Sequence, residues 1–163
     1  MNNANATVLI DGCRRELVRI EGVKSTFGST SPAMELMTKY SVIKCCGTIE
    51  QCFKTIIFDK VESNAAPQAR KYIEQTFREG SMNPSIENIY KSLNLFDKNW
   101  SNSFKEKVKN ISDADRIKAS LKSLNKNRND FAHGKSIIVS FLQVSNYFED
   151  SCLIIEALDE VVG

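Results

Sequence analysis

The residues best suited to chemistry lie in the stretch from Lys126 to Gly134. This stretch contains His133, the only histidine among 163 residues. Imidazole is the side chain whose ordinary pKa lies nearest neutral pH, so His133 is the first candidate for acid–base chemistry. Arg128 precedes it by five positions and Asn129 by four. A guanidinium matches the geometry of a phosphate, and an amide can hold either a phosphate oxygen or the imidazole.

The spacing of these three residues sets their directions on a helix. Positions five apart lie about 140° apart around the axis, whereas positions four apart share a face. Asn129 and His133 therefore share a face strictly, and Arg128 does not. Because an arginine side chain is long and Gly134 favours fraying at the helix end, we expect Arg128, Asn129 and His133 to line one wall of a pocket.

A phosphodiester could be cut by such a set without a metal. Neutral imidazole can take the proton from an RNA 2′-hydroxyl, and protonated imidazole can give one to the leaving 5′-oxygen. A single histidine supplies one of these functions at a time, and two copies across a dimer would supply both. A structural interpretation stays open beside this one, because positive groups near a helix C-terminus are also favoured by the helix dipole.

The same stretch resembles the signature of the HEPN superfamily, in which an arginine, usually followed by a polar residue, precedes a histidine by a few positions. Here the signature runs from Arg128 through Asn129 to His133, with Gly134 after it. From about residue 31 to residue 162 the chain is similar to the RiboL-PSP-type branch. The features that carry this similarity are Asn83-Pro84 before a short helix, Leu95-Phe96-Asp97 followed by Trp100, and the Asn-Arg-Asn…Ala-His-Gly ending.

The resemblance implies metal-independent cleavage of RNA at a composite site between two copies of the chain, and no cofactor. It implies that His133 is the general acid or base and that Arg128 stabilises the phosphate. Asn129 would hold the imidazole or a phosphate oxygen. It also implies a toxin or antiviral defence effector, with an antitoxin or a larger defence complex as partner. The alternative is a non-catalytic helical module that binds RNA, a nucleotide or a protein within such a complex.

Charge is concentrated around this motif. The formal net charge is only +2, but residues 105–135 carry nine basic and four acidic side chains. This excess favours a surface that attracts phosphate, and we predict Lys122, Lys126 and Lys135 as RNA contacts. The plainer interpretation is a solvated helix face on which lysines provide solubility.

Composition indicates one soluble globular domain. Hydrophobic residues make up 42% and charged residues 26%, with only three prolines. No apolar run reaches the length of a membrane span, and the polar start Met1-Asn2-Asn3 is not typical of a signal peptide, so we expect a cytoplasmic protein. The five cysteines are odd in number and form no Cys-x-x-Cys pair, which favours reduced core residues over a zinc site.

Apolar periodicity predicts an all-α bundle of five to seven helices, with residues 1–6 disordered. The predicted helices cover residues 7–27, 32–58, 67–78, a short stretch after 84, 98–110, 112–132 and 141–162. Ser112, Ser140 and Ser31 are the predicted N-caps of three of them. The helix over 32–58 has a long apolar stripe and should be central; its stripe contains Leu36, Tyr40, Ile43, Gly47, Phe53 and Ile57. Together, the apolar stripes of this helix and of the last helix are broader than one small bundle can cover. This predicts a twofold dimer.

Overall fold

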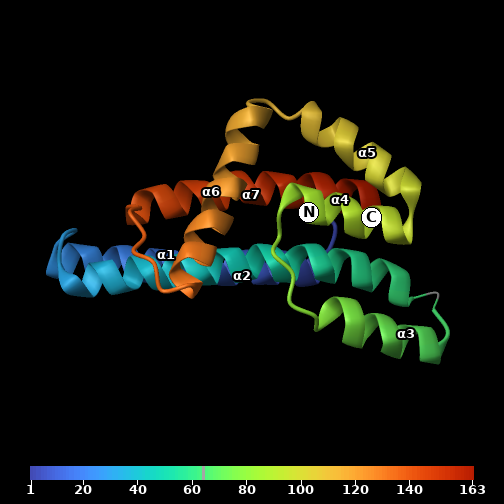
Figure 1. Ribbon diagram of the computed structural model, residues 1–163, viewed down its shortest axis with the longest axis horizontal. Helices are drawn as coiled ribbons and strands as arrows, with labels where there is room; N and C mark the ends of the chain where they lie inside the picture. Colours follow the sequence, from blue (N-terminus) through green and yellow to red (C-terminus); the bar gives the residue numbers. More distant parts are fainter. Residues whose placement is uncertain (64) are drawn as a thin grey trace.

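The computed structural model describes residues 1–63 and 65–163, which fold as seven α-helices and no strand (Figure 1). The all-α prediction is therefore confirmed. In chain order the helices are α1 (Ala4–Phe27), α2 (Pro32–Glu62), α3 (Pro67–Ile73), α4 (Ile86–Phe96), α5 (Lys98–Lys109), α6 (Ala114–Ala132) and α7 (Phe141–Val162). A π-helical turn, Glu74–Arg78, continues α3 directly.

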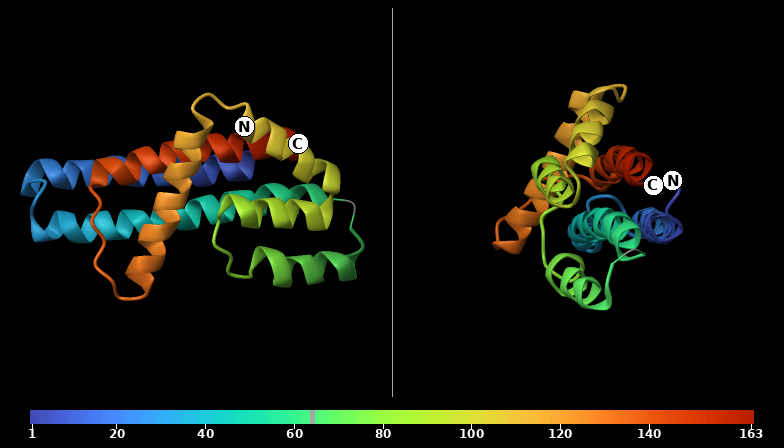
Figure 2. Two further views of the ribbon diagram at one scale, coloured as in Figure 1. Left: turned by 45° about the horizontal axis from the view of Figure 1, so that its top comes forward. Right: turned by 90° about the vertical axis from the view of Figure 1, so that its right-hand side faces the viewer.

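The long helices α1, α2 and α7 lie side by side, and α6 crosses them obliquely (Figures 1 and 2). Helix α2 packs against α1, α6, α7 and the π-helical turn, so the prediction that it is central is confirmed. The end of α6 reaches past α2, and the chain then returns to the start of α7 (Figure 2). This crossing holds the motif-bearing part of α6 against α2.

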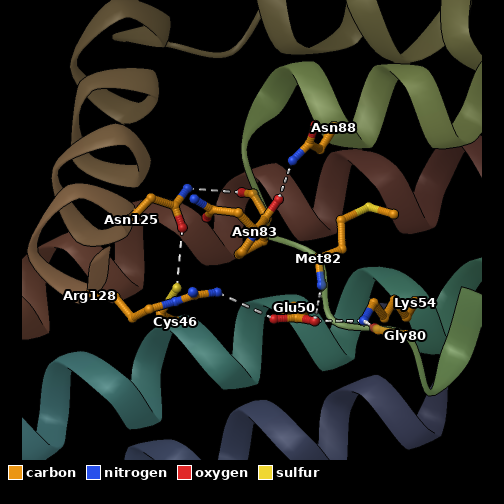
Figure 3. A network of polar contacts seen from close by, with 10 residues as sticks. Cys46, Glu50, Lys54, Gly80, Met82, Asn83, Asn88, Asn125 and Arg128 are labelled. Carbon is orange, nitrogen blue, oxygen red and sulfur yellow. Dashed lines mark hydrogen bonds and ion pairs between the residues drawn. The ribbon is translucent and has the colours of Figure 1, made fainter. Parts of the chain in front are cut away.

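A second layer is formed by the shorter helices. Phe77 of the π-helical turn stacks edge-on against Phe53 of α2, with ring centroids 6.0 Å apart, and against Phe96 of α4 at 5.1 Å. Such edge-to-face pairs add stabilisation beyond the apolar area they bury. They hold the π-helical turn against α2 and against the far end of α4. The segment 79–85, between this turn and α4, passes close to α6 (Figure 3).

Two of the three predicted N-caps are confirmed. The Ser31 hydroxyl accepts from the Met34 N–H at the start of α2, and Ser140 forms a capping box with Gln143 at the start of α7. The predicted cap of α6 is wrong by one residue. Asp113 precedes the first helical residue, in a left-handed conformation with φ of 59°, and its side chain makes no capping hydrogen bond. A tight turn, in which the Ala114 N–H donates to the Ile111 carbonyl, moves the start of the helix past Ser112.

The expected disorder of residues 1–6 is also wrong. Helix α1 already begins at Ala4, and the Asn3 side chain caps it by accepting from the Ala6 N–H. The N–H groups of Asn2 and Asn3 donate to the carboxylate of Asp159 on α7. The polar start of the chain is thus a helix cap bonded to a distant carboxylate, which composition alone cannot distinguish from a solvated tail.

The apolar stripe predicted on α2 is buried only in its second half. Phe53 and Ile57 are fully buried, but Leu36 is 63% exposed and Tyr40 and Ile43 are exposed as well. The buried face of the first half includes Thr38 instead. Its hydroxyl donates to the carbonyl one turn earlier, at Met34, at 2.8 Å, so it can be buried at low cost.

The cysteines are core residues, as predicted. All five are free and buried. Burial raises the pKa of the Cys52 thiol to about 12, so this side chain stays neutral and packs as a small hydrophobe. No helix among the described residues has the length and apolar character needed to cross a membrane.

Candidate functional site

The motif occupies the last two turns of α6. The helix ends at Ala132, His133 is its C-cap, and Gly134 follows with φ of 72°, a left-handed conformation that favours glycine. The Lys135 N–H donates to the Asp130 carbonyl at 2.9 Å and closes this end. The His133 side chain is exposed, and within the described residues its imidazole has no hydrogen-bond partner.

Arg128 turns away from the solvent, toward α2. Its side chain is 25% exposed, and its Nη2 lies 3.7 Å from Oε2 of Glu50 (Figure 3). This distance exceeds the 2.7–2.9 Å or so of a charge-assisted hydrogen bond. The guanidinium also lies beside the Cys46 thiol, whose pKa is raised by burial and only partly lowered again by Arg128. The arginine is therefore oriented by α2 without having its donors used up.

Glu50 is the centre of a polar network between α2 and the segment 79–85 (Figure 3). Its Oε1 accepts from the Lys54 ammonium at 2.6 Å and from the Met82 N–H at 2.8 Å. Lys54 is only 1% exposed and also donates to the Gly80 carbonyl. A buried charge of this kind is tolerated only when it is paired and hydrogen-bonded, so Glu50 and Lys54 hold each other in place.

Asn125 connects three parts of the chain. It is 95% buried, its amide donates to the Pro84 carbonyl at 3.2 Å, and its oxygen accepts from the Cys46 thiol at 3.2 Å (Figure 3). It thereby joins α6 to α2 and to the segment before α4. Sequence reasoning missed both Glu50 and Asn125. The available signals were an acidic residue within a widely apolar helix, four positions before Lys54, and an asparagine one turn before Asn129.

Asn129 faces a different space. It lines a cavity of about 570 Å³ between α6 and the start of α4. Arg128 follows the other side of α6, so the structure does not bring the two onto one wall, contrary to the expectation from the sequence. The reason is the step of about 100° between neighbouring residues on a helix. His133, one turn after Asn129, falls near the Asn129 side of α6 rather than near Arg128.

The three lysines predicted to contact RNA differ in position. Lys122 and Lys126 line the cavity, whereas Lys135 lies beyond the helix end and not in its wall. Lys126 and Lys135 both form ion pairs with Asp130, and Lys135 Nζ lies 3.3 Å from Asp130 Oδ1. These two ammonium groups, Lys126 first, lower the pKa of the Asp130 carboxyl. Of the three, Lys122 alone lines the cavity without an ion pair in the described part of the chain.

Comparison with known families agrees with this architecture. The family model described as RiboL-PSP-HEPN matches residues 13–163, so the chain is a HEPN-type domain. More narrowly, it belongs to the RiboL-PSP-HEPN family. The match begins within α1, earlier than the resemblance seen in the sequence. No curated protein and no solved structure matched the chain.

Proposed function

We propose that this protein is a metal-independent endoribonuclease of the HEPN type that acts as a toxin or an anti-phage defence effector. HEPN-type domains are often ribonucleases of defence or toxin systems. The observation that carries the proposal is an exposed His133, without a hydrogen-bond partner among residues 1–63 and 65–163, at the end of a helix with a row of lysines on the same side. An exposed imidazole can reach a substrate and exchange a proton with it, which a histidine held in a structural hydrogen bond does poorly.

The proposed reaction uses only protein side chains. The His133 imidazole takes the proton of the 2′-hydroxyl, the 2′-oxygen bonds to phosphorus, and the bond from phosphorus to the 5′-oxygen breaks. The leaving oxygen takes a proton from an imidazolium. Arg128 stabilises the charge that builds on the non-bridging oxygens, and Asn129 holds the imidazole or one of these oxygens. The products are a 2′,3′-cyclic phosphate and a 5′-hydroxyl end.

Two protons move in this reaction, which favours a twofold dimer with one His133 from each copy. Exposed apolar side chains lie on and after the end of α6: Phe131, a fully exposed Ile138, and Leu142. A second copy that covered them would bring the two α6 ends together and supply a second Arg128 as well. Light scattering should give about 37 kDa, twice the 18.4 kDa chain. A monomer at micromolar concentration would contradict the composite site.

The test is cleavage of RNA and the chemistry of its ends. Wild-type protein, freed of any inhibitor and given total cellular RNA, should produce 2′,3′-cyclic phosphate and 5′-hydroxyl ends. A substrate with 2′-deoxyribose at the cut nucleotide should stay intact, because the attacking oxygen is missing. Cleavage should persist in EDTA, because the proposed reaction requires no metal. If EDTA abolished cleavage and magnesium or manganese restored it, the chemistry would be wrong.

The second candidate is a non-catalytic module that binds RNA, a nucleotide or a protein, such as an antitoxin or another component of a defence complex. The contact between Arg128 and Glu50 favours it, since a guanidinium paired within its own chain need not serve a substrate. In that case wild type and the His133→Ala variant would both leave RNA intact. The same cleavage assay therefore separates the two candidates.

A further inference from the structure

The cavity beside α6 is built from the start of one helix and one side of another. Its volume, about 570 Å³, lies in the range of small-molecule sites. Leu121 and Ile86 give it an apolar floor, while Asn83 and Asn129 contribute amide side chains to its wall. Apolar walls with a few convergent polar groups are typical of sites that hold a planar, hydrogen-bonding ligand.

Three lysines follow one side of this cavity. Lys118, Lys122 and Lys126 are four residues apart on α6, so successive members differ by only about 40° around the axis and form a row. Asn129 and His133 continue the same side of the helix. The row therefore runs along the cavity toward His133, about 6 Å of helix length beyond Asn129. A chain of phosphates that followed the lysines would arrive at the imidazole.

Unused hydrogen-bonding groups also lie at this cavity. Asn83 Oδ1 is buried and has no donor within the described residues. At the start of α4, the Ser85 hydroxyl accepts a hydrogen bond from the Asn88 N–H. The N–H groups of Ile86 and Glu87 have no partner in the described part of the chain. Such donors suit an anion or a base carbonyl.

We propose that this cavity is a subsite for one nucleotide of single-stranded RNA, a proposal that rests on the function proposed above. The base lies against the amides and the apolar floor, and the flanking phosphates lie along Lys118, Lys122 and Lys126. The neighbouring phosphodiester is thereby presented to His133. Single-stranded RNA fits this arrangement because its bases can turn out of the stack into a pocket while its phosphates follow a positive row.

A thiol placed in the cavity tests the subsite without any need for cleavage. All five native cysteines are buried, so iodoacetamide should react chiefly with an introduced exposed thiol. Ala119 lines the cavity and is exposed, and Ala69 is an exposed alanine on the distant α3. We expect 2′-O-methyl RNA, which cannot be cut, to slow alkylation of Ala119→Cys about tenfold at ten times its Kd. Alkylation of Ala69→Cys should not change.

Variants that remove one lysine charge provide a second test of the subsite. Lys122→Gln should weaken binding of the same RNA and lower the log–log salt slope by roughly 0.7, the value for one lost phosphate contact on a single strand. Lys71→Gln, an equal charge change on α3, should leave the slope unchanged. AMP is the probe for a free nucleotide, and we expect it to protect Ala119→Cys far less than RNA does.

The possible outcomes separate the subsite from the ribonuclease. RNA that binds without protecting Ala119→Cys overturns the subsite, and so does protection by AMP without protection by RNA. If RNA protects the cavity but wild type cuts nothing, the cavity stands as an RNA site and the proposed ribonuclease falls. If wild type cuts RNA and the cavity is never protected, the ribonuclease stands and the subsite falls.

Discussion

Helix α6 has two sides that are built in opposite ways. On one side Asn125 and Arg128 are held against α2, and Asn125 also bonds to the segment before α4, through contacts that use Cys46 and Glu50 (Figure 3). On the other side Asn129 and a row of lysines line an open cavity. The first side is largely buried and its polar groups are paired. The second side is open, and within the described residues it includes Lys122 without an ion pair and Asn83 Oδ1 without a donor. The difference indicates that one side fixes where α6 lies and the other is available to a ligand.

Arg128 and Asn129 are neighbours in sequence that fall on these two sides. Under the proposed function this division is useful, because a transition-state group gains from being held in place before the substrate arrives. A partly buried arginine beside a carboxylate loses little orientation freedom when a phosphate binds.

The largest expected effect belongs to His133. His133→Ala should lower the rate of RNA cleavage by about 10²–10⁴-fold, the usual contribution of a positioned proton-transfer group. RNA affinity should change little, because the cavity and the lysine row remain. Single-turnover cleavage and fluorescence anisotropy measure the two quantities. Lys71→Gln serves as the surface control, and unchanged helicity and mass of the variant exclude a folding defect. An equal loss of rate and affinity would place His133 in binding rather than in proton transfer.

The second largest effect concerns Glu50, on the side of α6 that is held against α2. Glu50→Gln leaves Lys54, which is 1% exposed, without its charge partner, and this should lower the free energy of unfolding by about 3 kcal/mol. Glu35→Gln is the matched control, because Glu35 and Lys39 form the same four-residue pair on α2 at its exposed surface. That variant should leave the free energy of unfolding almost unchanged, because solvent screens an exposed pair. Urea unfolding measures both.

A double variant distinguishes a paired charge from a simple contact. Glu50→Gln with Lys54→Met removes both charges, so it should recover a large part of the loss caused by Glu50→Gln alone. If the double variant were as unstable as the sum of the two single variants, the pair would carry no coupling. The side of α6 that is held against α2 would then gain no rigidity from this charge pair.

Local sequence signals predicted the parts of this fold that depend on local chemistry. Ser31 before Pro32, Ser140 before its apolar run, and Gly134 after the motif mark helix ends that the structure reproduces. Each signal depends on a side chain and a backbone group within a few residues of each other. The position of the motif at the end of α6 could be predicted for the same reason.

Long-range partners could not be predicted in this way. Arg128 meets Glu50 from a different helix, and the Asn2 N–H bonds to Asp159 across 157 residues of sequence. Helical periodicity indicates which residues share a face but not which face another element covers. Leu36 shows the same limit, since it belongs to the apolar stripe of α2 and yet lies at the surface.

The smallest expected effect concerns Asp130 on the open side. Lys126 and Lys135 lower the pKa of its carboxyl below the ordinary value of 3.8. A carboxyl with a depressed pKa stabilises the folded state above the pKa it has in the unfolded chain, and this contribution is lost as pH falls through the folded pKa. Because the group is near the surface, solvent screens the pairs, and Asp130→Asn should lower the Tm at pH 7 by only about 1–2 °C.

Carboxyl titration by NMR checks the cause directly. Lys126→Gln should raise the pKa of Asp130 more than Lys135→Gln does, because Lys126 has the larger influence on it. The Tm difference between wild type and Asp130→Asn should shrink as pH falls below the ordinary pKa of an aspartate. A stability loss as large as that of Glu50→Gln would mean that Asp130 and its lysines form a second rigid network. The lysines would then be committed within the chain, and this side of α6 would not be free to bind the phosphates of RNA.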